Sequence, residues 1–172
     1  MAQTVIVREE RPDDNANIWR VNEAAFGRAG EADLVNALRQ VGAVIASLVA
    51  EHDGKIVGHI LFTPVTVKSE QAQHAAVALG PMAVLPSYQG QGIGSRLVQA
   101  GLAACREVGH NAVFVLGHRD FYPRFGFVTS KPYGIQCEFD VPDGAFMVQA
   151  LQANALTGIR GVVKYHPEFR KV

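Results

Sequence analysis

The chain has little of what would crosslink a protein, anchor it or give it a strong charge. It holds two cysteines, Cys105 and Cys137. Neither belongs to a C-x-x-C pair or to a Cys/His spacing typical of metal sites, so we expect no metal. The longest apolar run, residues 75–86, is broken by Gly and Pro and is too short to span a bilayer. The N-terminal apolar run is too short for a signal peptide, which predicts a cytoplasmic protein with no membrane partner.

The chain also has no excess of positive or negative charge. Sixteen Lys and Arg residues balance sixteen Asp and Glu residues. No net field attracts a polyanion, so a nucleic-acid partner is not expected. The 172 residues are 48% hydrophobic and 19% charged. A chain of this size buries roughly 70% of its unfolded surface, and we expect one globular domain over residues 1–172.

Hydrophobic spacing predicts a mixture of helices and strands. Asp53-Gly54 is a strong hairpin signal, Gly109 suits a helix C-cap, and Asp120 suits the N-cap of a short helix that ends at Gly126. A continuous apolar strand at 112–116 is expected to run parallel to the preceding strand. The expected helices are 12–26, 31–41 and 92–108, and the expected strands are 4–8, 45–51, 55–67, 74–84, 112–116, 146–151 and 161–165.

A glycine-rich stretch opens the third helix. It reads Gln89-Gly90-Gln91-Gly92-Ile93-Gly94-Ser95. Glycines let the backbone approach a ligand closely, and the first turn of a helix has amide donors without intrahelical partners. The stretch therefore predicts a cradle for an anion, with phosphate or pyrophosphate as the expected guest.

Two common nucleotide motifs do not fit this stretch. In a dinucleotide fingerprint the third glycine comes one residue later, and an acidic residue ends the next strand. A Walker A loop closes with Gly-Lys-Ser/Thr, whereas this loop closes with Gly94-Ser95-Arg96. The remaining pattern, Gln89-x-x-Gly92-x-Gly94, resembles the coenzyme A pyrophosphate motif of the GNAT superfamily of N-acetyltransferases.

A second motif strengthens this resemblance. GNAT proteins carry an aromatic pair followed by Gly-aromatic downstream of the loop, and here the segment reads Phe121-Tyr122-Pro123-Arg124-Phe125-Gly126-Phe127. Residues 79–84, 116–118 and 165–169 are similar to the YhbS-like branch of the superfamily. The resemblance covers nearly the whole chain. It implies an α/β (α+β) fold, with a mixed, mostly antiparallel sheet of about six or seven strands splayed at its middle and helices on both faces.

The same resemblance implies how acetyl-CoA is held. The pantetheine arm would insert between two splayed strands like an extra strand. Pro81 fits an irregular strand there, although Gly80-Pro81 also fits an ordinary bulge. The implied cofactor-binding residues are Met82, Ala83 and Val84 for pantetheine and Gln89, Gly90, Gln91, Gly92, Ile93, Gly94 and Ser95 for pyrophosphate.

The implied reaction is acetyl transfer to a primary amine. Tyr122 matches the family's usual general acid, and the alternative is a tyrosine whose ring only fills the core. The base stays open among His118, Glu31 and His166, because an amine with a pKa of about 10.4 must lose a proton before it attacks. The turn 26–33 is expected to frame the amine pocket together with Tyr165-His166.

Acceptor and oligomeric state are open. A small-molecule or peptide amine would be the partner, and the chain would be a monomer or homodimer. Two other interpretations remain. The first is a non-catalytic acyl-CoA-binding sensor or interaction module, which would not need Tyr122. The second is an unrelated anion-binding domain with a purely structural glycine-rich turn.

Overall fold

A computed structural model describes residues 4–172, which divide into two compact units. Unit 1 holds the described residues up to Phe62, with Pro81–Gly101 and Pro167–Val172. Unit 2 holds Thr63–Gly80 and Leu102–His166. Three elements have residues in both units. Among residues 4–172, no helix is long and apolar enough to cross a membrane. The single domain over 1–172 stays a prediction.

The strands of unit 1 form an antiparallel meander. β1 (Val5–Glu9) pairs with β2 (Ala46–His52), and β2 pairs with the first part of β3 (Lys55–Lys68). The turn between β2 and β3 is the hairpin predicted from Asp53-Gly54. Both residues have positive φ, at 49° and 77°. Two positive φ angles define a type I′ turn, whose twist matches that of the flanking strands.

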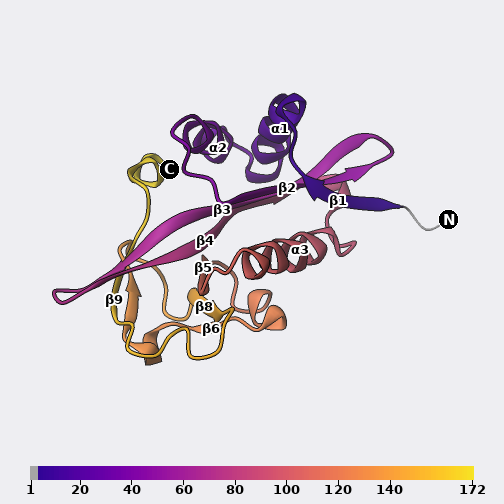
Figure 1. The fold of residues 1–172 in the computed structure, drawn as a ribbon. Helices are drawn as coiled ribbons and strands as arrows, with labels where there is room; N and C mark the ends of the chain where they lie inside the picture. Colours follow the sequence, from indigo (N-terminus) through magenta and orange to yellow (C-terminus); the bar gives the residue numbers. More distant parts are fainter. Residues whose placement is uncertain (1–3) are drawn as a thin grey trace. The chain divides into compact units, whose positions relative to one another are not determined.

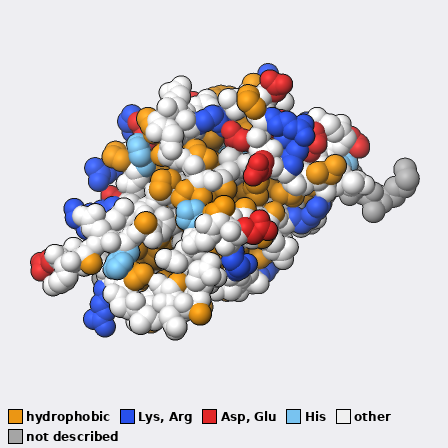
Figure 2. Space-filling view, viewed as in Figure 1, with side chains coloured by type: hydrophobic (Ala, Val, Ile, Leu, Met, Phe, Trp, Pro, Cys, Tyr) orange, Lys and Arg blue, Asp and Glu red, His pale blue; other side chains and the backbone are white. Residues whose placement is uncertain are grey.

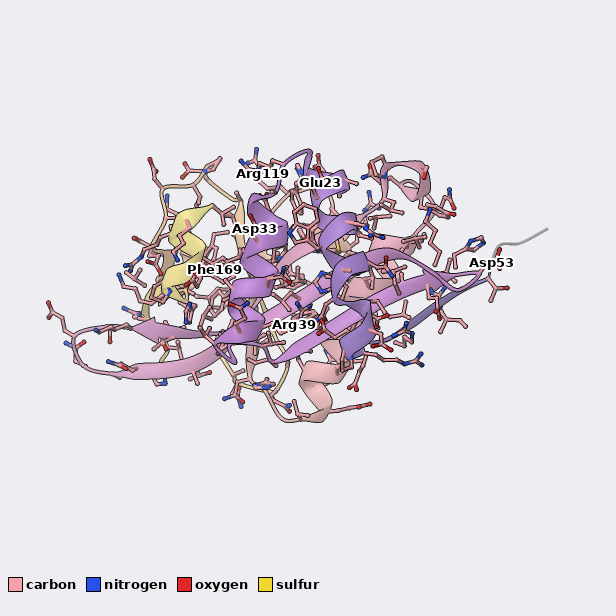
Figure 3. All side chains as sticks on the ribbon, turned by 90° about the horizontal axis from the view of Figure 1, so that it is seen from above. Glu23, Asp33, Arg39, Asp53, Arg119 and Phe169 are labelled. Atoms are coloured by element: carbon pink, nitrogen blue, oxygen red, sulfur yellow. The ribbon has the colours of Figure 1, made fainter. Side chains whose placement is uncertain are left out.

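Two helices cover one side of these strands. α1 (Asn15–Phe26) follows a short 3-10 turn, η1 (Pro12–Asp14), and α2 (Gly30–Gln40) comes directly after it. Figure 1 shows α1 and α2 on the same side of β2 and β3. The last segment, η5 (Pro167–Lys171), brings Phe169 beside α2, as Figure 3 shows from above. Their shared core contains Ile18, Val21, Leu34, Leu38, Val49, Ile56 and Leu61, with Phe169 packed against it.

The other side of β3 in unit 1 carries the third helix, α3 (Ile93–Glu107). A Cβ on Gly58 would lie 3.1 Å from Leu97 Cδ1 and 3.3 Å from Ile93 Cγ2, so the helix packs closely against this glycine and a side chain there would crowd it. Within unit 1, helices therefore lie on both faces of the strands, as expected from the sequence.

One extra residue in β3 decides which side chains face each helix. Ala50 pairs with Gly58 and Glu51 pairs with Ile56, so Val57 forms a β-bulge. Its carbonyl accepts a hydrogen bond from the Leu85 amide at 2.9 Å. The bulge thus ties the hairpin to the chain just ahead of the glycine-rich loop.

Unit 2 is built around β5 (Ala112–Leu116). This strand pairs in parallel with β4 (Gln73–Val84) at Val77–Leu79, which confirms the expected parallel pair. β5 also pairs antiparallel with β8 (Phe146–Ala150), which continues to β6 (Val128–Thr129). β7 (Ile135–Cys137) pairs with β9 (Gly161–Lys164), and β9 pairs with the end of β3. The core of unit 2 includes Val65, Ala78, Phe114, Ile135, Phe146, Val148 and Val163.

The described residues form nine strands, and the main path of the sheet runs β1-β2-β3-β4-β5-β8-β6. The sequence predicts six or seven, because β6 and β7 have only two and three residues and show no alternation. The sheet is mixed and mostly antiparallel, as expected. The sheet is also expected to be splayed at its middle, where β4 and β5 would separate beyond the residues at which they pair, and this stays a prediction.

Of the two helix caps predicted from the sequence, one is confirmed and one is wrong. Gly109 closes α3 with a φ of +88°, and its amide bonds the Arg106 carbonyl at 3.1 Å, which confirms the C-cap. The predicted cap at Asp120 was wrong. The short helix is a 3-10 turn, η3 (Tyr122–Phe125), and its N-cap position is Phe121, so Asp120 lies one residue outside.

A chain of hydrogen-bonded polar groups runs from the buried core of unit 1 to half-buried Glu10 and Arg39. His59 is fully buried, with Nδ1 3.2 Å from Asn22 Nδ2 and Nε2 2.9 Å from Ser47 Oγ. The Ser47 hydroxyl donates to Glu10, which also accepts two hydrogen bonds from Arg39. Because the Asn22 amide donates to Nδ1, the imidazole is neutral and carries its proton on Nε2. Burial lowers the pKa of His59 to about 4.

Candidate active site

The glycine-rich loop joins β4 to α3 within unit 1. β4 ends at Val84, a 3-10 turn, η2 (Pro86–Tyr88), follows, and α3 begins at Ile93. Gly90 and Gly92 have φ of +77° and +82°, and a Cβ on either would meet no atom within 4 Å. Glycine is required here by the backbone conformation, and open space lies in front of the loop.

The amides at the start of α3 have no acceptor within the helix. The Arg96 amide bonds the Gly92 carbonyl at 3.1 Å, which is the first turn of α3. The amides of Ile93, Gly94 and Ser95 therefore come before any intrahelical acceptor, at the positive end of the helix dipole. Gly90, Gln91 and Gly92 are exposed. The structure thus shows exposed glycines and helix-start amides without intrahelical partners, and anion binding by them stays a prediction.

Side chains brace the two ends of the loop. Gln89 Nε2 donates to the Val84 carbonyl at 2.9 Å, so Gln89 folds back onto the end of β4. The Tyr88 ring packs against His52 at 5.7 Å, and the Lys55 ammonium lies 5.9 Å from its centroid. Arg96 donates to the Val5 carbonyl at 2.6 Å. These contacts hold the loop in place and add two positive charges near it.

The strand segment before the loop has two different faces. Ala83 is buried in the core of unit 1, whereas Met82 and Val84 are half-buried. Gly80 has a φ of +136°, a conformation that residues with a side chain rarely adopt. β4 is therefore irregular directly before Pro81, as its glycine-proline pair predicts.

Tyr122 lies in unit 2 at the start of η3 and is 7% exposed. Its ring makes edge contacts with Phe121 at 5.0 Å and Phe127 at 5.7 Å between centroids. Burial raises the pKa of Tyr122 to about 12. The phenol is therefore protonated at every pH near neutrality, and its ring is held on two sides.

His118 touches Tyr122 through the backbone. Its carbonyl accepts hydrogen bonds from the Phe121 amide at 3.2 Å and the Tyr122 amide at 3.3 Å, while the residue itself is exposed. The structure brings the two predicted residues together in unit 2. The observed role of His118 is to support the turn that carries Tyr122.

Glu31 lies in the first turn of α2, in unit 1, and is 8% exposed. It accepts hydrogen bonds from Arg28 Nε at 2.9 Å and Arg28 Nη2 at 2.5 Å. This pairing lowers the pKa of Glu31, against the opposing effect of burial. Asp33, which ends the turn expected to frame the amine pocket, accepts a hydrogen bond from Trp19 Nε1 at 2.9 Å.

Tyr165 and His166 belong to unit 2. The Tyr165 amide donates to Glu138 Oε2 at 2.5 Å, and its ring packs against Phe139 at 5.4 Å. Burial raises the pKa of Tyr165. Their expected partnership with the turn 26–33 stays a prediction.

The two cysteines are free thiols. Cys105 is buried in α3, and burial raises its pKa to about 11. Cys137 is half-buried, and burial raises its pKa as well. Within residues 4–172, no group of three or more His, Cys, Asp and Glu side chains is placed to hold a metal ion.

The sequence alone did not point to two further residues, Gly117 and His59. Gly117 lies against the Tyr122 ring, and His59 lies in the polar chain of unit 1. A glycine directly after a buried strand is a weak signal for close packing. A lone histidine in an apolar strand gives no signal of its partners, which come from distant parts of the chain.

The loop, the aromatic turn and the fold define a class. Residues 14–127 match the family described as Acetyltransferase (GNAT) family. The chain belongs to this family.

Two curated proteins and two solved structures match over most of the chain. It is 36% identical over 168 residues to the uncharacterized N-acetyltransferase YhbS of Escherichia coli K12, covering 97% of this chain and 99% of that protein. It is 40% identical over 150 residues to YjhQ of the same strain, covering 84% and 83%. The crystal structure of E. coli YhbS in complex with CoA matches with a TM-score of 0.91 and 35% identity, covering 99% of this chain and 94% of that one. A GNAT acetyltransferase from Brucella melitensis in complex with acetyl-CoA matches with a TM-score of 0.80 and 36% identity, covering 98% and 99%.

Proposed function

We propose that this protein transfers an acetyl group from acetyl-CoA to a primary amine by direct attack of the amine on the thioester. The observation that carries the proposal is the open glycine loop at the start of α3, with Gly90 and Gly92 at positive φ. Relatives with 35% and 36% identity bind CoA and acetyl-CoA in their crystal structures. The acceptor is a small-molecule or peptide amine.

The amides from Gln91 to Ser95 would hold the pyrophosphate. Free amide donors and the helix dipole both favour a doubly charged group at this position. Met82 and Val84 would offer backbone groups to the pantetheine arm, although the Val84 carbonyl already accepts one hydrogen bond from Gln89. Lys55 and Arg96 add favourable charge beside the loop.

Coenzyme A affinity tests this assignment. Gly92→Glu should weaken binding at least ~10-fold, because it puts a side chain and a negative charge where the pyrophosphate would lie. Titration calorimetry with coenzyme A measures the effect. The matched control is Gly109→Glu, the same change at a positive-φ glycine at the other end of α3. Equal affinity in the two variants would place the cofactor elsewhere.

Turnover tests the reaction itself. Free thiol released from acetyl-CoA should rise when amines are added from a panel of polyamines, amino acids, aminoglycosides and lysine peptides. A chain that binds coenzyme A tightly but releases no thiol with any of these amines would instead be an acyl-CoA sensor. The expected cytoplasmic location and the monomeric or homodimeric state stay predictions.

Tyr122 would protonate the departing thiolate. A phenol with a pKa of about 12 is a weak donor toward a thiol in water, whose pKa is about 8.5. Burial of the departing thiolate would raise its pKa as well and would narrow this difference. A smaller difference in pKa between the phenol and the thiol favours this proton transfer.

Glu31 is poorly suited to be the base. Its pairing with Arg28 lowers its pKa, so it holds a proton less readily than a free carboxylate. We propose that Glu31 acts by charge, holding Arg28 or an acceptor cation in the turn 26–33. The amine would then lose its proton to His118, whose side chain is free to reach solvent, or through water.

Glu31→Gln separates these two roles. It should raise the acceptor KM roughly 3- to 10-fold, the effect of losing one charge-assisted contact. It should leave the acetyl-CoA KM and the pH dependence of kcat unchanged. Steady-state kinetics from pH 6 to 9 provides the measurement, with Glu168→Gln, another carboxylate in an i,i+3 pair, as the control. A lost limb in the kcat profile would make Glu31 the base.

A further inference from the structure

Gly117 has no side chain at the place where the Tyr122 ring lies. A Cβ built on Gly117 would be 2.9 Å from Tyr122 Cδ2 and 3.3 Å from Cζ, and nearer still to Cε2. Real Cβ atoms do not approach heavy atoms closer than 3.0 Å, so any side chain at this position forces a shift. The φ of Gly117 lies outside the left-handed region, so this angle does not itself require glycine. The reason for glycine here is the tyrosine ring.

Neither side of this contact yields easily. The Gly117 amide donates to the Ala145 carbonyl at 3.0 Å, which fixes the backbone. The Tyr122 amide is bonded to the His118 carbonyl, and the Tyr122 ring meets Phe121 and Phe127 edge-on. Packed interiors transmit such strain and do not absorb it. A methyl group at 117 would therefore push the ring edge that carries the hydroxyl.

We propose that Gly117 is a positioning residue for acyl transfer: its bare backbone sets the place of the Tyr122 hydroxyl against the departing thiolate. This inference rests on the proposed role of Tyr122 as the proton donor. Gly117 touches no reacting atom and acts only through the tyrosine ring.

Gly117→Ala should lower kcat with little change in KM for acetyl-CoA. Relief of the overlap needs a ring shift of roughly 1 Å, and a misplacement of that size costs up to ~10²-fold in rate. We expect kcat to fall ~10- to 100-fold. Coenzyme A affinity by calorimetry should stay within twofold.

Gly101→Ala is the matched control. Gly101 lies in α3 against the Phe62 ring, and a Cβ there would overlap that ring as closely. This variant carries a comparable packing strain in unit 1 without touching Tyr122. It should lower the melting temperature and keep kcat near that of the parent protein. If Gly101→Ala lost as much kcat, general destabilisation would explain the effect of Gly117→Ala. That result would overturn the inference.

A double-mutant cycle gives the sharper readout. If Gly117 acts through the Tyr122 hydroxyl, Gly117→Ala should cause no further loss of kcat in the Tyr122→Phe background. A full additional loss in that background would overturn the inference.

A second pair of variants covers the case in which Gly117→Ala does not fold. Phe127→Leu opens space behind the ring, so Gly117→Ala/Phe127→Leu relieves the strain while the hydroxyl stays displaced. Its kcat should remain ~10-fold or more below that of Phe127→Leu alone. Equal kcat in these two would overturn the inference.

The cycle also separates this inference from its premise. A Tyr122→Phe variant with full kcat would remove the acid role of Tyr122 and this inference together. A slow Tyr122→Phe beside a fast, folded Gly117→Ala would remove the positioning role alone.

Discussion

Phenylalanine in place of Tyr122 is expected to lower kcat by ~10²–10⁴-fold, the usual range for loss of a general acid. The change deletes the hydroxyl and keeps the ring that packs against Phe121 and Phe127. Fold and coenzyme A affinity should therefore be preserved. Single-turnover thiol release, in which product dissociation does not limit the rate, is the measurement.

Tyr133→Phe controls for the loss of a phenol, since Tyr133 is an exposed tyrosine of unit 2. It should react at the parent rate. The parent enzyme should also show no alkaline loss of rate from Tyr122 below about pH 10, since its phenol titrates at about 12. A single-turnover rate that is the same with and without the Tyr122 hydroxyl would leave the residue as part of the core.

The stability of unit 1 is expected to fall by about 2 kcal/mol between pH 7 and pH 5 because of His59 alone. Burial holds the pKa of His59 at about 4 in the folded protein, against 6.5 for an ordinary histidine. Below pH 6.5, His59 takes up a proton in the unfolded chain but stays neutral in the folded chain. Stability is therefore complete above pH 6.5 and declines as the pH falls toward 4, by about 3 kcal/mol in all.

Burial is the main cause of the low pKa of His59, and its hydrogen-bond partners also disfavour a second ring proton. A second ring proton would sit on Nδ1 and face the Asn22 amide group, which already donates to that atom. Asn22 cannot simply turn over, because its Nδ2 also donates to the Ile18 carbonyl at 3.0 Å. The Glu10 carboxylate favours the charged ring, and the Arg39 guanidinium paired with that carboxylate opposes this effect.

Urea denaturation measures this dependence. Trp19 is the single tryptophan and lies in α1, so its fluorescence follows unit 1 directly. The expected loss should disappear in His59→Gln, which has no ionisable ring, and persist in His118→Gln, which changes an exposed histidine. A parent protein equally stable at pH 7 and pH 5 would mean that His59 is protonated in the folded state at pH 5.

Much of the fold could be predicted because its signals are local. Apolar spacing placed α3 to within one residue, the Asp-Gly pair placed the β2–β3 turn, and an unbroken apolar run placed β5 as a buried parallel strand. Each of these signals lies within a few residues of the feature it predicts. β6 and β7 are too short for any periodicity, and they exist because neighbouring strands offer them backbone partners.

The candidate site also has features that the sequence predicts and features that it does not. The open loop follows from glycines that are adjacent in sequence, so its position and backbone character could be predicted. The pairing of Glu31 with Arg28 is also local, at i and i+3, yet the sequence did not reveal that the carboxylate would be buried and held at a lowered pKa. The ring of Tyr122 against Gly117 depends on how a turn folds back on the end of β5, which residue types alone do not specify.

The extra residue in β3 restricts where this protein can tolerate insertions and deletions. The turn at Asp53-Gly54 is exposed, and loop tips of this kind usually accept changes in length. Val57 is different, because removing it would turn the side chains of Lys55 and Ile56 to the opposite faces and take away the carbonyl that holds the Leu85 amide. Deletion of this one residue of β3 would then also disturb the glycine-rich loop. Length variation among natural or engineered versions of this chain should accordingly gather at the tip and avoid the bulge.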